Sequence, residues 1–115
     1  QDVGKALNPE SVRGQIEGGI LQGVGLAVME ELVVDRGVIR NPNFTDYLLP
    51  TILDAPDVEA LLIEEEGSWG PYGAKGVGEP PTISSTAAVA AAIRNATGRP
   101  INRVPVRPQD IVIEG

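Results

Sequence analysis

The stretch at residues 70–81, with the sequence GPYGAKGVGEPP, most restricts what this chain can fold into. It contains four glycines and three prolines. Glycine costs a helix or strand conformational entropy and proline removes a backbone donor, so the pattern predicts a loop of defined shape. Glycines let backbone N–H groups approach a ligand closely, and the prolines after Glu79 restrict how its carboxylate leaves the loop. Glu79 is therefore either a solvated surface carboxylate or a held functional acid.

The loop matches neither common glycine-rich phosphate pattern. Lys75 follows Ala74 and precedes Gly76, which is not the order of a P-loop, and the glycine pair at 76 and 78 is followed by Glu-Pro-Pro instead of a third spaced glycine. Nucleotide binding by either route is not expected.

The chain contains no cysteine and no histidine. This inventory excludes zinc fingers, cysteine-ligated clusters, disulfide scaffolds and Ser-His-Asp triads within the chain, and we predict no metal-ligating residues. A formal net charge of −7 argues against a nucleic-acid or anionic-membrane partner, because such binding needs a basic surface. Aromatic residues make up only 3% of the chain, so we expect close backbone packing against something large.

The length of 115 residues, with 42% hydrophobic residues, predicts one α+β domain over residues 1–115. No apolar run reaches the roughly 18 residues of a transmembrane helix. The chain does not begin with methionine, and residues 1–4 are typical of the middle of a domain. We therefore expect a segment of a longer protein.

One long helix is predicted from Pro9 to about Leu32. Asn8 can cap it, proline suits the first helical position, and apolar residues then recur at helical spacing. Its glycines each cost about 1 kcal/mol relative to alanine, so tertiary contacts must offset them.

Small residues lie four apart on this helix, at Gly19, Gly23 and Ala27. They would let either a second helix or a flat ligand approach the helix axis. Gln15 also has two interpretations: it is exposed, or it is buried and pairs with a heterocycle that offers both donors and acceptors.

The other elements are predicted from local patterns. We expect a small, mostly antiparallel sheet and an alanine-rich second helix capped by Thr82 or Ser84 and stopped by Gly98. The ranges are a hairpin at 32–39, an irregular stretch at 44–50, a strand (or alternatively a helix) at 57–64, the second helix at 82–96, and an extended tail with an edge strand at 111–113.

Taken together, the pieces resemble the C-terminal part of the molybdenum-cofactor-binding large subunit of the xanthine dehydrogenase and aldehyde oxidase family, the molybdenum hydroxylases. The resemblance covers nearly the whole chain and rests on the order and spacing of several motifs. They are DVG and NP near the start, GQIEGG at 14–19, QGVG at 22–25, NFTDY at 43–47, GAKGVGEPP at 73–81 and NATG at 95–98.

The resemblance implies an enzyme that hydroxylates an aldehyde or N-heterocycle with a molybdopterin-type molybdenum cofactor. Glu79 would be the general base that removes a proton from a hydroxide ligand of the metal, which acts as a Lewis acid. The cofactor-binding residues implied by the resemblance are Gln15, Gly18, Gly19, Gly76, Val77 and Gly78. Lys75 matches the family pattern, but the sequence indicates no role for it.

The implied partners are the remainder of the large subunit, iron–sulfur and FAD modules on other domains or subunits, and a small-molecule substrate, in an oligomeric cytoplasmic complex. By itself the chain is expected to bind neither molybdenum nor substrate and to be inactive. Two alternatives remain. One is a non-catalytic binding or assembly module of a degenerate paralogue, marked by an exposed apolar, glycine-lined face. The other is a non-redox domain whose glycine loop binds an anion.

Overall fold

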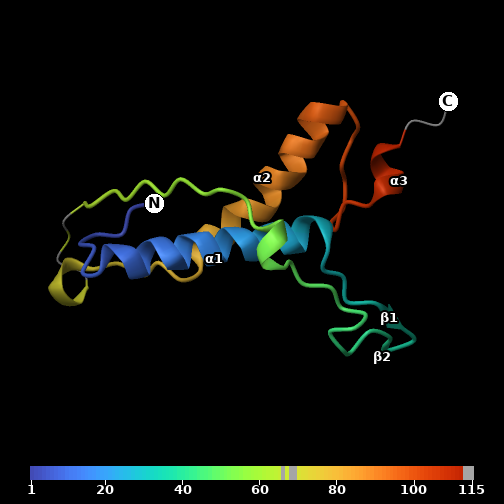
Figure 1. Cartoon of the computed structure of the whole chain (residues 1–115), viewed down its shortest axis with the longest axis horizontal. Coiled ribbons are helices and arrows are strands. Elements are labelled where there is room, and N and C mark those ends of the chain that lie inside the picture. The colour runs from blue at the N-terminus through green and yellow to red at the C-terminus, as the bar shows by residue number, and fades with distance from the viewer. Residues whose placement is uncertain (66, 68–69, 113–115) are drawn as a thin grey trace.

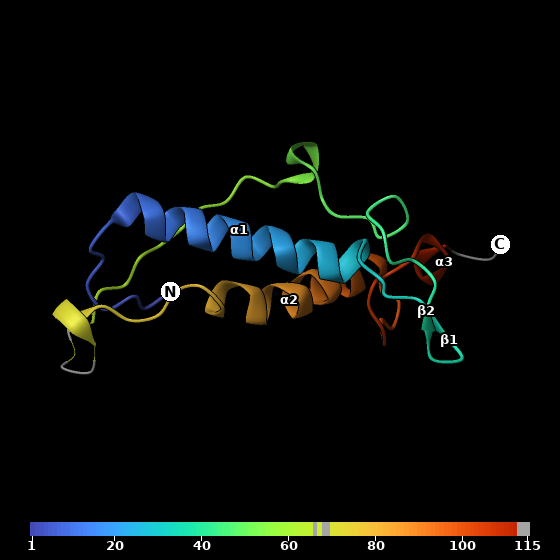
Figure 2. The same ribbon diagram turned by 90° about the horizontal axis from the view of Figure 1, so that it is seen from below.

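The structure is a computed structural model that describes residues 1–65, 67 and 70–112. Its two long helices, α1 (Pro9–Val28) and α2 (Pro80–Thr97), pack against each other, as Figures 1 and 2 show. The short elements are the strands β1 (Val34–Asp35) and β2 (Val38–Ile39), the 3₁₀ turns η1 (Ile52–Asp54) and η2 (Pro71–Gly73), and the helical turn α3 (Pro108–Ile111). A glycine-rich helix, an alanine-rich helix and a small antiparallel sheet confirm the predicted α+β fold class.

Helix α1 begins where the sequence predicts. The side chain of Asn8 accepts a hydrogen bond from the backbone N–H of Ser11, and Pro9 occupies the first helical position. The helix ends at Val28, four residues before the expected end. The N–H of Met29 makes the last i to i−4 bond, to the carbonyl of Gly25, and the N–H of Glu30 donates to the same carbonyl at 2.8 Å instead of continuing the helical pattern. The chain then turns away toward the hairpin.

Helix α2 begins earlier than predicted. Its N-cap is Glu79, whose side chain makes no capping bond, so the expected caps further along the sequence were wrong. Pro80 and Pro81 occupy the first turn, where a missing N–H group costs no helical hydrogen bond. The last two residues of the predicted loop are therefore helical. At the other end Gly98 adopts the left-handed conformation, with φ at 68°, and stops the helix as predicted.

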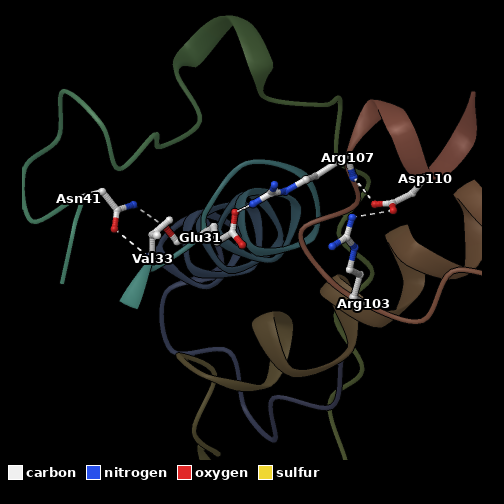
Figure 3. Close-up of polar contacts among 6 residues, drawn as sticks. All are labelled: Glu31, Val33, Asn41, Arg103, Arg107 and Asp110. Carbon is white, nitrogen blue, oxygen red and sulfur yellow. Dashed lines mark hydrogen bonds and ion pairs between the residues drawn. The ribbon is translucent and has the colours of Figure 1, made fainter. Parts of the chain in front are cut away.

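The predicted hairpin is confirmed. Strands β1 and β2 pair antiparallel through a two-residue turn at Arg36 and Gly37, and both turn residues have positive φ, at 50° and 79°. Asn41 fixes the base of the hairpin, as Figure 3 shows. Its side chain accepts a bond from the N–H of Val33 at 2.8 Å and donates to the carbonyl of Glu31 at 2.6 Å.

Two predicted strands do not form. Residues 57–64 are extended, with neither the predicted ladder nor the alternative helix, and make one parallel bridge between Ile63 and Asp2. The predicted edge strand is replaced at Ile111 by α3, which the carboxylate of Asp110 caps by accepting from the N–H of Arg107 at 2.8 Å. Ile113 lies outside the described residues. Among the residues that the structure describes, neither segment pairs with another strand along its length, and a β-strand is stable only when its backbone is paired.

The C-terminal segment returns to the end of α1. The N–H of Val106 donates to the carbonyl of Ala27 at 2.7 Å, and both side chains are buried. Figure 3 shows the ion pair between Arg107 and Glu31 beside this contact. The four buried hydrophobic residues of the described part of the chain are Val3, Ile16, Ala27 and Val106.

This small core leaves much apolar surface uncovered. The Cα radius of gyration is 17.4 Å, against about 13 Å for a compact chain of this length. The accessible surface of 8397 Å² exceeds the roughly 6,000 Å² of a compact monomer of equal mass. Ile52, Leu53 and Ile83 are 85%, 93% and 75% exposed. Among the described residues, no helix is long and apolar enough to cross a membrane.

Candidate functional site

Hydrogen bonds and one ion pair join the glycine-rich loop to the N-terminal segment of the chain. The N–H of Lys5 donates to the carbonyl of Gly73 at 2.8 Å, and the N–H of Lys75 donates to the carbonyl of Val3 at 3.0 Å. The Lys75 ammonium also pairs with the carboxylate of Asp2, which accepts a further bond from the N–H of Gly4 at 2.9 Å. The Lys75 bond, followed by the Gly4 bond, lowers the pKa of Asp2 below its usual value. Lys75 thus ties the loop to the start of the chain.

Glu79 lies at the other end of this loop, at the first turn of α2. Its backbone carbonyl accepts from the N–H groups of Thr82 at 2.9 Å and Ile83 at 3.3 Å, so the helix holds the residue's backbone. Its side chain is exposed and lines a hollow of about 350 Å³. The other lining residues of this hollow, here called the Glu79 hollow, are Gln22, Gly78, Thr82 and Ile83.

The α1–α2 contact sets the position of the Glu79 hollow. A Cβ on Gly19 would lie 2.7 Å from the Cβ of Pro81, and a Cβ on Gly23 would collide with the Cβ of Ser85, so glycine is needed at both positions for this approach. The close helix packing that the small-residue row allowed is therefore confirmed. The hydroxyl of Thr82 donates to the carbonyl of Gly19 at 3.2 Å, while that of Thr86 donates to Gly23 at 3.1 Å.

The structure brings together some of the predicted site residues and separates others. The Oε1 atom of Gln15 lies 3.9 Å from the position of a Cβ on Gly78, so this exposed amide sits directly beside the loop next to Glu79. Gly76 has open space around it. Val77 is half-buried.

The two adjacent glycines of α1 face different surroundings. Gly19 is buried under the start of α2. Gly18 instead lines a separate hollow of about 460 Å³ together with residues of the extended segment, among them Ile52 and Pro56. Figure 2 shows this segment and α2 on opposite sides of α1. Gly18 therefore does not join the group around Glu79.

Gln22 and Thr82 also belong to this group, although the sequence pattern predicts no site role for either residue. Gln22 lies seven residues after Gln15, which is nearly two helical turns, so the two amides share one face of α1. That spacing was a usable signal for Gln22. The sequence predicts Thr82 only as a possible helix cap, whereas its hydroxyl oxygen lies 3.2 Å from both the carbonyl of Gly19 and the Oε1 atom of Gln22 on α1.

The chemistry of this region suits a pterin edge and a proton acceptor. Within residues 1–65, 67 and 70–112, Glu79 is the only titratable residue that lines the hollow. The amide of Gln15 offers both donors and an acceptor beside Gly78, and the open space at Gly76 lets a flat group approach the backbone. No group of three or more potential acidic, cysteine or histidine ligands occurs in the described ranges. The amide beside Gly78 and the open space at Gly76 therefore fit one wall of a pterin-binding site.

Residues 1–56 match the family model described as a molybdopterin cofactor-binding domain. The chain is also 42% identical, over 98% of its own length, to the putative xanthine dehydrogenase molybdenum-binding subunit of Escherichia coli strain K12. The chain is therefore similar to part of a molybdenum-binding subunit. It spans 15% of the length of that relative.

Solved structures support the same relationship in three dimensions. The chain matches quinoline 2-oxidoreductase from Pseudomonas putida with a TM-score of 0.87 and 39% identity, over 96% of this chain and 14% of that one. It matches the aldehyde oxidoreductase from Desulfovibrio desulfuricans with a TM-score of 0.84 and 38% identity, over 96% of this chain and 12% of that one. These two relatives are named as oxidoreductases, and the family model and the Escherichia coli relative are named for molybdopterin and molybdenum binding. The similarity to molybdenum-binding oxidoreductases that the motifs indicate is therefore confirmed.

Proposed function

We propose that this chain is the C-terminal segment of a molybdenum hydroxylase large subunit and supplies its general base, Glu79. In this proposal residues 1–115 belong to one molybdopterin-binding domain, and the complete enzyme hydroxylates an aldehyde or N-heterocycle. The observation that carries the proposal is the Glu79 hollow, in which a single carboxylate lies among neutral polar groups beside a glycine loop.

Different residues of the chain would contact the cofactor, hold the two helices together and accept the proton. Gln15, with the backbone of Gly76, Val77 and Gly78, would contact the pterin, and Gly19 would hold the two helices close enough to form that wall. The bound cofactor would supply the oxidising centre of the reaction. Glu79 would accept a proton at a carboxylate oxygen, since its position at the start of α2 directs the side chain into the hollow.

The exposed apolar surface supports the expectation that a large partner covers this chain. Apolar residues such as Leu53 and Ile83 would be covered by the remainder of the large subunit, and iron–sulfur and FAD modules would complete the enzyme in an oligomeric cytoplasmic complex. The Glu79 hollow opens to the surface of this chain. Alone, the chain would therefore bind neither cofactor nor substrate and would be inactive.

The test uses the complete enzyme that contains this chain, with the substitution Glu79→Gln. The amide keeps the size of the side chain but cannot act as a base, so turnover should fall by about 10²- to 10⁴-fold. Molybdenum and pterin content should remain unchanged. The matched control is Glu59→Gln in the extended segment, an exposed carboxylate remote from the hollow, which should leave turnover unchanged.

The same experiment separates catalysis from the alternative function. Exposed apolar side chains are also expected of a non-catalytic assembly module, so they do not discriminate between the two. A module of that kind would show neither bound molybdenum nor a loss of turnover in Glu79→Gln. Turnover retained in Glu79→Gln with molybdenum bound would remove the general-base assignment.

A further inference from the structure

The two ends of the glycine-rich loop are held by different parts of the chain. At one end, residues 2–5 lie against residues 73–75, and Gly4 and Ala74 form an antiparallel bridge there. This contact is here called the loop clamp. At the other end, the first turn of α2 holds Glu79 through two backbone hydrogen bonds to its carbonyl. The loop is therefore anchored on both sides of residues 76–78.

The three residues between these anchors are those proposed to contact the pterin. Among the described residues, the backbone N–H groups of Gly76, Val77 and Gly78 donate to no acceptor. A Cβ at Gly76 would meet no atom within 4 Å, and one at Gly78 would meet only the Oε1 atom of Gln15, at 3.9 Å. The position of these backbone donors therefore depends on the two anchors.

Gly4 allows the loop clamp to close. Its φ of 61° lies in the left-handed region that favours glycine. A Cβ on Gly4 would collide with the carbonyl oxygen of Gly73 and would lie 3.1 Å from the backbone nitrogen of Lys75. Both are backbone atoms of the loop, so a side chain at position 4 would push the two segments apart.

The side chain of Lys75 belongs to the same clamp. Its ammonium pairs with the carboxylate of Asp2, whose other oxygen accepts a bond from the N–H of Gly4 at 2.9 Å. Lys75 does not line the Glu79 hollow. The ammonium is thus directed at the N-terminal segment of the chain, and the ion pair joins the same two segments as the backbone bridge.

We propose that Asp2, Gly4 and Lys75 are positioning residues, which hold residues 76–78 where their backbone can contact the pterin. The inference rests on the proposed function for the identity of the ligand. It goes further by assigning a role to Lys75 and to the N-terminal segment. A segment anchored at both ends loses less conformational freedom on binding, and each residue that is already ordered contributes about tenfold in affinity.

The first experiment compares Gly4→Ala with the unsubstituted complete enzyme. Release of molybdopterin should become about tenfold faster. In the cofactor-free form, hydrogen exchange should also become faster at the amides of Lys5 and Lys75, which both donate hydrogen bonds within the clamp. The matched control is Gly37→Ala, which also places alanine at a positive φ, of 79°, but meets no atom within 4 Å. It should change neither measurement.

The second experiment tests the ion pair and does not require Gly4→Ala to fold. The side chains of Lys75 and Asp2 are 36% and 38% exposed, so Lys75→Met and Asp2→Asn should each speed release by only about two- to fivefold. The double variant should release the cofactor no faster than either single variant, because both remove one interaction. Lys75→Arg keeps the cation and should restore retention. The control Arg40→Met, which removes the exposed pair with Asp35, should have no effect.

The outcomes separate this inference from the proposed function. Unchanged release in Gly4→Ala, or an equal increase in Gly37→Ala, would overturn the loop clamp. Faster release in Lys75→Met with unchanged release in Asp2→Asn would also overturn it, because Lys75 would then bind the cofactor directly. Retained turnover in Glu79→Gln would instead reject the general base, and the release and exchange measurements would still report on the clamp.

Discussion

Replacement of Gly19 by alanine tests whether the α1–α2 contact controls the site. The added Cβ would lie 2.7 Å from the Cβ of Pro81, 3.2 Å from the hydroxyl oxygen of Thr82 and 3.3 Å from its backbone nitrogen. Carbon atoms in contact prefer a separation of about 3.5–4.0 Å, so the start of α2 must move away from α1 by about 1 Å. Pro81 lies two residues from Glu79, so that movement displaces the carboxylate.

Two opposing effects set the expected change in the free energy of unfolding of Gly19→Ala. A third effect, the displacement of Glu79, sets the expected change in kcat/KM. Overpacking of this kind costs about 1–3 kcal/mol, whereas alanine gains about 1 kcal/mol over glycine within a helix. The free energy of unfolding should therefore fall by about 0–2 kcal/mol. A displacement of about 1 Å at a catalytic group can cost on the order of 100-fold in rate, so kcat/KM should fall much more than stability.

The assay is kcat/KM of the complete enzyme, with thermal unfolding of the same samples. Gly14→Ala is the control, because a Cβ at Gly14 meets no atom within 4 Å. It should gain about 0.5–1 kcal/mol of stability from helix propensity and leave activity unchanged. If Gly19→Ala behaved like Gly14→Ala, the contact with Pro81 would not position Glu79.

Two further predictions concern contacts outside the hollow. Asn41→Ala should lower the free energy of unfolding of the complete subunit by about 2 kcal/mol, because it leaves the N–H of Val33 and the carbonyl of Glu31 without partners. The control is Asn43→Ala, which changes an exposed side chain and should have little effect on thermal unfolding. Equal losses of stability in the two variants would contradict the role of the Asn41 hydrogen bonds. The pKa of Asp2 is lowered in the folded chain, so its contribution to stability is present above its usual value of 3.8 and is lost as pH falls below it. Asp2→Asn should remove that part of the acid dependence, and an unchanged acid unfolding profile would contradict it.

Several elements were predictable because their signals are local. Asn8 and Pro9 mark the start of α1, and Gly98 marks the end of α2, since capping depends on residues only a few positions apart. The turn of the hairpin needs two residues with positive φ, and Gly37 adopts this conformation without the steric cost that a Cβ would bring.

The two failed strand predictions share a physical cause. Residues 57–64 and Ile111 have the apolar pattern of strands, but a strand requires a partner whose presence no local pattern reveals. The tail instead uses Asp110 to cap a helical turn. The start of α2 lies earlier than the sequence pattern predicts for a different reason. Two consecutive prolines indicate a loop, but the first turn of a helix tolerates both.

The sequence by itself determined the helices, the hairpin, the glycine-rich loop and the family resemblance, and it singled out Glu79 and Gln15 as candidates. Only the tertiary structure decided which side chains surround Glu79. Gly19 and Gly23 let α2 approach α1 closely, and this crossing places Gln22 and Thr82 in the hollow that Glu79 lines, whereas Gly18 lines a separate hollow. Helical spacing relates residues on one helix, but the neighbours across a helix crossing depend on backbone approach, which the small side chains permit and do not specify.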